Sequence, residues 1–177
     1  MNFNKYADYY DLFYKKKNYS DEVRKIHKII KLNKKDNILE VGCGTGQHSI
    51  ELAKYVNQIH AIDKSEKMIK NAKKKVKKLK KANKKIIFNV KDIVKLSNKV
   101  KYDKIIMLFH VFSYFVDDLY LKKVFKKLNN ILNPAGYIIF DCWNYSYVNK
   151  YGLSDSSREI ELKNYFIKRL GKLKKIK

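Results

Sequence analysis

The chain has 177 residues, 45% of them hydrophobic, and a formal net charge of +24. This length and composition predict one globular domain, and a single proline and six glycines exclude a linker or low-complexity spacer. Cys43 and Cys142 are too few for a disulfide framework and lack metal-ligand spacing, so we expect no metal site and a reduced, cytoplasmic setting. The most apolar stretch, Ile105–Val116, contains His110 and is too short to span a bilayer, and we expect no membrane partner.

The positive charge is carried almost entirely by lysine, and the only arginines are Arg24, Arg158 and Arg169. A pI near 9.8 is typical of proteins that bind nucleic acid. Bidentate recognition of phosphate or guanine favours arginine, however, and codon bias also enriches lysine. We therefore favour the interpretation that the lysines lie on helix faces exposed to solvent, and we keep nucleic-acid binding as the alternative.

Residues 1–34 are predicted to form an aromatic lid and a helix. Four aromatic side chains recur there at helical spacing: Tyr6, Tyr9, Tyr10 and Phe13. This pattern is more commonly that of a helix that packs on the domain by its aromatic face. The alternative, compatible with such packing, is a lid whose tyrosines close over a site. Ser20, followed by two acidic residues, is the expected N-cap of the next helix.

Residues 35–144 alternate short apolar runs with amphipathic stretches, which predicts an α/β fold with a doubly wound, mostly parallel sheet and helices on both faces. The expected strands are 38–41, 59–62, 86–90, 104–109 and 137–140. The expected helices between them span about 50–56, 66–81 and 121–132. Residues 145–177 form a polar, basic tail with one expected strand, Glu159–Ile167.

The stretch Ile38–Ser49 runs from strand character into three glycines at alternate positions and then into a helical pattern. Such a turn brings bare backbone N–H groups close to a bound group. Asp63 ends the second strand and can accept hydrogen bonds from both ribose hydroxyls, while Asp92, just past the third, can accept one from an exocyclic amine. Together these groups predict a pocket for an adenosine-containing cofactor.

The run Glu40-Val-Gly-Cys-Gly-Thr-Gly46, followed by Asp63, Asp92 and Asn133-Pro-Ala-Gly136, resembles the class I S-adenosylmethionine-dependent methyltransferases over about residues 36–144. A nicotinamide dehydrogenase is disfavoured, since its Gly-x-Gly-x-x-Gly pattern would need glycine where the chain has Gln47. The resemblance implies a Rossmann-like sheet and S-adenosylmethionine as the cofactor.

The resemblance also implies roles for single residues. Those expected to bind the cofactor are Tyr19, Glu40, Gly42, Cys43, Gly44, Gly46, Asp63, Lys64, Met68, Asp92, Ile93 and Phe109. His110, at a strand exit, is the expected catalytic base, the alternative being that it only hydrogen-bonds the cofactor or a neighbour. Tyr14 is the second catalytic candidate, because a tyrosine face can stabilise a cation.

The runs Tyr9–Tyr14 and Phe109–Tyr114 resemble small-molecule methyltransferases, among them enzymes that N-methylate nucleotide-linked amino sugars. The implied reaction is direct transfer of a methyl group to a nitrogen or oxygen of a small molecule. Two alternatives stay open: an RNA or protein methyltransferase steered by the lysines, and a truncated, inactive cofactor-binding remnant. This family usually adds a sixth and an antiparallel seventh strand, and few residues follow Asn144, so we expect incomplete C-terminal strands. The oligomeric state also stays open, with a homodimer as one option.

Overall fold

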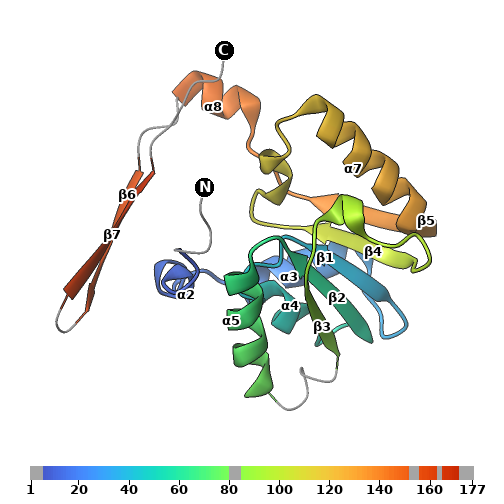
Figure 1. Cartoon of the computed structure of the whole chain (residues 1–177), viewed down its shortest axis with the longest axis horizontal. Helices are drawn as coiled ribbons and strands as arrows, with labels where there is room; N and C mark the ends of the chain where they lie inside the picture. Colours follow the sequence, from blue (N-terminus) through green and yellow to red (C-terminus); the bar gives the residue numbers. More distant parts are fainter. Residues whose placement is uncertain (1–5, 80–84, 152–155, 163–164, 172–177) are drawn as a thin grey trace.

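A computed structural model describes residues 6–79, 85–151, 156–162 and 165–171 (Figure 1). Its centre is a five-stranded parallel sheet in the order β3-β2-β1-β4-β5. The strands are β1 (Asn37–Val41), β2 (Gln58–Asp63), β3 (Ile86–Val90), β4 (Tyr102–Met107) and β5 (Leu132–Phe140). The order reverses between β1 and β4, and ligands bind at such a switch point beyond the carboxyl ends of the strands.

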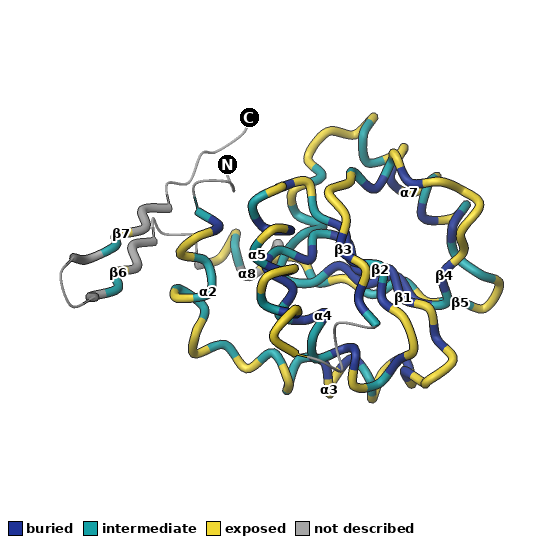
Figure 2. The backbone as a smooth tube through the Cα atoms, turned by 60° about the horizontal axis from the view of Figure 1, so that its bottom comes forward, coloured by how far each residue is buried: buried dark blue, intermediate teal, exposed yellow. Residues whose placement is uncertain are grey.

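Helices cover both faces of the sheet. On one face lie α3 (Tyr19–Ile30), α4 (Gln47–Leu52) and α5 (Glu66–Lys77), and on the other lies α7 (Asp118–Ile131). Successive residues of a strand serve opposite faces, so Ile38 packs with the first layer of helices and Leu39 with α7. Figure 2 shows the buried residues gathered along the central strands. The predicted doubly wound α/β fold is confirmed.

The ends of two helices differ from the prediction. The side chain of Asn18, not Ser20, caps α3, because its Oδ1 accepts the N–H of Asp21 at 2.9 Å. The prediction of Ser20 as the cap is wrong, since Ser20 lies inside the first turn. Near the N-terminus, residues Tyr10–Phe13 of the aromatic run form the short helix α2.

The last two strands of the sheet also differ. β4 ends at Met107, because Phe109 and His110 adopt left-handed backbone angles, with φ of 65° and 61°. β5 begins at Leu132, directly after α7, with a register shift opposite Tyr102 and Lys104. Residues 133–136, which lie between the predicted helix and the predicted strand 137–140, are therefore a bulged part of the strand itself.

The C-terminal part holds more structure than the predicted tail. It contains α8 (Tyr145–Tyr151) and an antiparallel hairpin of β6 (Ser156–Leu162) and β7 (Tyr165–Gly171). The single strand predicted for Glu159–Ile167 is wrong, because Ile160 and Ile167 pair across two different strands. The hairpin projects beside α2 and forms a separate two-stranded sheet (Figure 1). Since it does not pair with β5, β5 is an edge strand of the described five-stranded sheet.

Within the described ranges, no helix combines the length and the apolar character that a membrane span requires.

Candidate cofactor-binding site

The turn between β1 and α4 depends on glycine at three positions with positive φ: Gly42, Gly44 and Gly46. A Cβ added to Gly46 would lie 2.8 Å from Cζ of Phe88, so close packing excludes a side chain there. A Cβ added to Gly44 would meet no heavy atom within 4 Å. The backbone at Gly44 therefore borders open space, as a cradle for a ligand requires.

The carboxylate of Asp63 joins this turn to the end of β2. Its Oδ2 accepts the N–H of Gly44 at 2.9 Å, and its Oδ1 accepts the N–H of Ser65 at 2.8 Å. Burial raises the pKa of Asp63, while these backbone bonds act in the opposite direction. Two residues predicted to bind the cofactor thus lie in direct contact, and the carboxylate keeps lone pairs for further donors.

Glu40 supports the turn from inside the sheet. It lies in β1 with 2% of its surface exposed and accepts a hydrogen bond from the hydroxyl of Ser49 in α4. Burial raises the pKa of Glu40 to about 7, although nearby His48 and Ser49 favour its charged form. Its side chain therefore ties the strand before the turn to the helix after it.

The N-terminal segment is attached to the glycine turn through Asp11, a residue that the sequence did not single out. Oδ1 of Asp11 accepts hydrogen bonds from Thr45 at 2.6 Å and from Gln47 at 3.3 Å. Its Oδ2 lies 2.7 Å from Nζ of Lys75 in α5. These contacts bring α2 against the loop, although the predicted role of the segment as a lid stays a prediction.

Aromatic rings line the region next to this segment. Tyr14 meets Phe109 edge-on, with 4.8 Å between ring centroids, and Nζ of Lys17 lies 4.5 Å from the Phe109 centroid. Tyr19 packs edge-on against His48, and its buried hydroxyl has no hydrogen-bond partner within the described residues. Burial raises the pKa of Tyr19. A polar ligand group would satisfy this hydroxyl.

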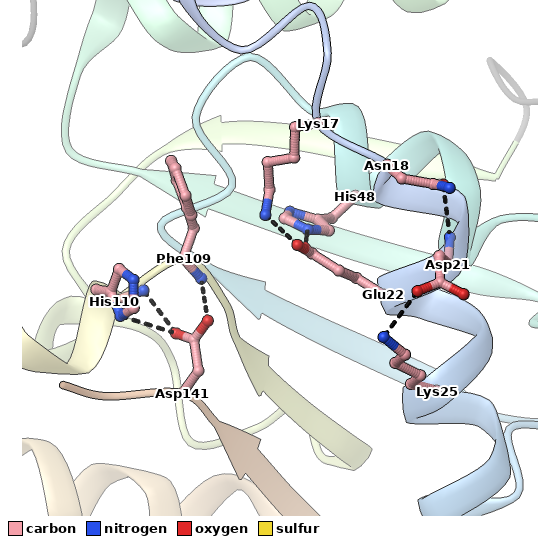
Figure 3. A network of polar contacts seen from close by, with 9 residues as sticks. All are labelled: Lys17, Asn18, Asp21, Glu22, Lys25, His48, Phe109, His110 and Asp141. Atoms are coloured by element: carbon pink, nitrogen blue, oxygen red, sulfur yellow. Dashed lines mark hydrogen bonds and ion pairs between the residues drawn. The ribbon is translucent and has the colours of Figure 1, made fainter. Parts of the chain in front are cut away.

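A half-buried polar network joins α3 to α4 (Figure 3). Nε2 of His48 lies 2.7 Å from Oε2 of Glu22, and Lys17 contacts the other oxygen of Glu22. Burial acts to raise the pKa of Glu22, but the bonds from His48 and Lys17 lower it to about 2. His48 is buried, with 6% of its surface exposed, so its ring is part of the packing between α3 and α4.

The predicted base, His110, is held at the carboxyl end of β4 by groups that follow β5. Asp141 accepts the backbone N–H of Phe109 at 3.0 Å and that of His110 at 2.5 Å (Figure 3). The His110 ring stacks on Trp143, with 4.3 Å between centroids, and its Nδ1 is buried 4.0 Å from Asp141. Asp141 and Trp143 thus cap and pack the end of the strand.

Asp92 caps a 3-10 turn at Ile93–Lys95 and contacts polar side chains from the loop after β2 and from α7. Its Oδ1 accepts the hydroxyl of Tyr120 at 2.6 Å, and its Oδ2 lies 3.0 Å from Nζ of Lys64. Burial acts to raise the pKa of Asp92, but the bonds from Tyr120 and Lys64 lower it. Tyr120, in the first turn of α7, carries no local sequence signal for this role.

The remaining predicted cofactor residues are parts of the interior. Met68 and Ile93 are each 2% exposed and Cys43 is 6% exposed. Burial raises the pKa of the Cys43 thiol. These side chains shape the walls behind the turn. Over the part of the chain that the structure describes, no three His, Cys, Asp or Glu side chains form a metal-binding group.

Known proteins share this architecture. The model of a family described as "Methyltransferase domain" matches residues 38–136. YqeM of Bacillus subtilis (strain 168), which carries a provisional name as a methyltransferase, is 27% identical over 111 residues, covering 62% of this chain and 43% of YqeM.

Solved structures agree. The S-adenosylmethionine-dependent methyltransferase from Clostridium acetobutylicum ATCC 824 is 27% identical, with a TM-score of 0.70, over 93% of this chain and 66% of that one. The sugar N-methyltransferase KedS8 from Streptoalloteichus sp. ATCC 53650 is 20% identical, with a TM-score of 0.70, over 91% and 64%. The chain spans less than two thirds of the length of each of these relatives.

Proposed function

Since this chain belongs to the methyltransferase domain family, we propose that it binds S-adenosylmethionine and methylates a nitrogen or oxygen of a small molecule. The observation that carries the proposal is the hydrogen bond from the N–H of Gly44 to Asp63, beside open space at Gly44. It joins the glycine turn to the acid of the neighbouring strand. When bound, S-adenosylmethionine supplies an electrophilic methyl group.

The residues present fit this cofactor. The turn around Gly44 would face its methionyl part, Asp63 would accept the ribose hydroxyls, and Asp92 would accept the adenine amine. The buried hydroxyl of Tyr19 offers one more polar contact. The cofactor is cationic, and the aromatic ring of Phe109 can attract a cation, as its contact with the ammonium of Lys17 illustrates.

The catalytic roles go to His110 and Tyr14, which both contact Phe109. Because Nδ1 of His110 is buried, Nε2 is the nitrogen that would take a proton from the acceptor. The ring stacked on Trp143 and the turn bound by Asp141 would hold that nitrogen in place. Such positioning of reactants can supply about 7–11 kcal/mol of the barrier reduction in a transfer reaction.

A small-molecule acceptor is supported by the aromatic run Tyr9–Tyr14, whose segment contacts the turn through Asp11. KedS8 is a sugar N-methyltransferase of the same fold, so sugar amines are the acceptors to test first. The residues also leave open an RNA or protein acceptor attracted by the lysines. RNA affinity that falls steeply with salt would favour that acceptor class.

The cofactor assignment is tested by titration calorimetry with S-adenosylhomocysteine. Asp63→Ala should abolish measurable binding, because the turn and the ribose lose the same carboxylate. Asp21→Ala, which removes a partly exposed carboxylate from α3, is the matched control and should bind normally. Unchanged affinity of Asp63→Ala would contradict the assignment. Transfer of a labelled methyl group to amino sugars, lost in His110→Ala with binding retained, would test the catalytic role.

A further inference from the structure

The two oxygens of Asp92 have partners of different kinds. Oδ1 accepts two groups that the fold fixes: the N–H of Val94 at 3.1 Å and the hydroxyl of Tyr120 at 2.6 Å. Oδ2 has one partner among the contacts of the described residues, Nζ of Lys64 at 3.0 Å. A further donor that approaches this carboxylate would therefore meet Lys64 at Oδ2.

Tyr120 is a rigid partner. Its own backbone N–H donates to the N-capping side chain of Asp117 at 2.6 Å, and its ring packs against Phe115 with 5.7 Å between centroids. The Tyr120 hydroxyl thus fixes the orientation of Asp92 from the first turn of α7. Nζ of Lys64 lies 4.5 Å from the Tyr120 centroid, so one tyrosine contacts both members of the ion pair.

Lys64 is the exchangeable partner. Its side chain is 59% exposed, against 19% for Asp92, and it sits on a flexible stem just after β2. An ion pair this exposed contributes little to stability and weakens with salt. A ligand donor can therefore displace the ammonium into solvent at small cost, while Oδ1 keeps both of its partners.

We propose that Lys64 occupies the nucleobase end of the pocket and competes with the exocyclic amine of the cofactor for Oδ2 of Asp92, while Tyr120 positions the carboxylate for both. This inference rests on the proposed function. In this competition an adenine ligand binds the carboxylate only when the ion pair is open, so the apparent affinity is reduced by the fraction of molecules in which the pair is closed. Loss of the ammonium should consequently tighten binding, although Lys64 borders the site.

The test compares two ligands by calorimetry at low salt: S-adenosylhomocysteine and its analogue with hydrogen in place of the purine amine. Lys64→Met keeps the apolar stem and should tighten S-adenosylhomocysteine binding by about two- to fivefold, the range expected for an exposed ion pair. The analogue, which has no donor for Oδ2, should bind both proteins equally. Lys64→Arg keeps the charge and the ion pair, so it should not tighten S-adenosylhomocysteine binding.

Lys70→Met is the charge-matched control, since it removes an exposed lysine from α5. It should change neither affinity. Tyr120→Phe should reduce the preference for S-adenosylhomocysteine over the analogue by about three- to tenfold, since a positioning hydrogen bond to a charged group is lost. Thermal melting would verify that each variant is folded.

The outcomes separate the two proposals. If no protein binds S-adenosylhomocysteine, the proposed function fails. If the original protein binds it and Lys64→Met binds it equally or more weakly, competition by Lys64 is refuted. If Lys64→Met bound the analogue more tightly by the same factor, the inference would also be overturned, because the change in affinity would then not depend on the exocyclic amine. An unchanged ligand preference in Tyr120→Phe would overturn the positioning role.

Discussion

Asp141, just past the carboxyl end of β5, accepts a hydrogen bond from the backbone N–H of His110 at 2.5 Å. Its second oxygen accepts the N–H of Phe109 at 3.0 Å. Both donor residues have positive φ, which costs an L-residue about 1–2 kcal/mol. One carboxylate thus stabilises an unfavourable turn and thereby sets the position of the proposed base.

Asp141→Ala should lower the free energy of unfolding by about 1–3 kcal/mol, because two backbone donors lose a charged acceptor. It should also lower the rate of methyl transfer by about ten- to a hundredfold, since small displacements of a reacting group are costly. Urea unfolding and single-turnover transfer would measure the two effects. The affinity for S-adenosylhomocysteine should change little.

A matched carboxylate provides the control for this variant. Asp103 accepts the N–H of Asn37 and the side-chain amide of Asn133, each at 2.8 Å, where β1 and β4 begin. Asp103→Ala should therefore lower stability and leave the transfer rate intact. Equal loss of rate in both variants would show that His110 depends on general stability and not on Asp141.

A methyl group added at Gly46 should mainly reduce stability, whereas one added at Gly44 should mainly reduce cofactor binding. Gly46→Ala combines positive φ with a Cβ 2.8 Å from Phe88, and should lower the free energy of unfolding by about 2 kcal/mol or more. Gly44→Ala meets no atom and should cost only about 1 kcal/mol of backbone strain. Its methyl group would project into the cradle, so cofactor binding should be lost.

Thermal unfolding and calorimetry together test this contrast. A folded Gly44→Ala protein that binds S-adenosylhomocysteine with the original affinity would show that the cofactor does not lie against this turn. A Gly46→Ala protein as stable as the original would mean that Phe88 can move aside.

Sequence alone predicts the parts of the site that follow from local pattern. The apolar run Ile86–Val90 is β3 with the predicted bounds, and Asp63 ends the second strand as expected. Because parallel strands end at one edge of the sheet, the order of the strands along the chain is enough to place their carboxylates and the glycine turn at that edge.

The contacts that complete the site could not be predicted, because they join residues far apart in the chain. Asp11 and Thr45 are separated by 34 positions, and Asp92 and Tyr120 by 28. No helical or strand period links such pairs. The predicted end of β4 lies too far along the chain for the same reason: its apolar pattern continues to Phe109, and the left-handed turn depends on a carboxylate 32 positions away.

The contact between Asp11 and the glycine turn predicts that the N-terminal segment affects cofactor affinity. Asp11→Ala removes the bonds to Thr45 and Gln47 and the ion pair with Lys75. We expect about five- to tenfold weaker binding of S-adenosylhomocysteine, with faster release, because charge-assisted bonds between segment and loop are lost. Stopped-flow fluorescence would measure the release.

Asp8→Ala is the control for this segment. Asp8 pairs with Lys67 at 2.5 Å, so it also joins the N-terminal segment to α5, but the pair is exposed and does not contact the turn. We expect it to change affinity less than twofold. Equal effects of the two variants would argue against a specific role of the turn contact.

Two carboxylates predict opposite dependences of stability on pH. The folded-state pKa of Glu40 is raised from 4.5 to about 7, so the folded protein binds more protons than the unfolded chain in that interval. Its contribution to the free energy of unfolding is complete below pH 4.5 and is lost as the pH rises through about 7. For Glu22, with a pKa lowered to about 2, the contribution is present above pH 4.5 and is lost as the pH falls toward 2.

Urea unfolding between pH 3 and pH 8 would therefore distinguish the contributions of Glu40 and Glu22 to the free energy of unfolding, because this range covers most of both pKa shifts. Glu40→Gln should make the fall in stability between pH 4.5 and about 7 shallower, because a buried group no longer loses a proton. Glu22→Gln should leave that fall unchanged and reduce the loss at acidic pH. Glu51→Gln, which removes a carboxylate that pairs with exposed Lys54, is the control for a general change of charge. A Glu40→Gln curve parallel to that of the original protein would contradict the raised pKa, because the proton uptake that it predicts would then be absent.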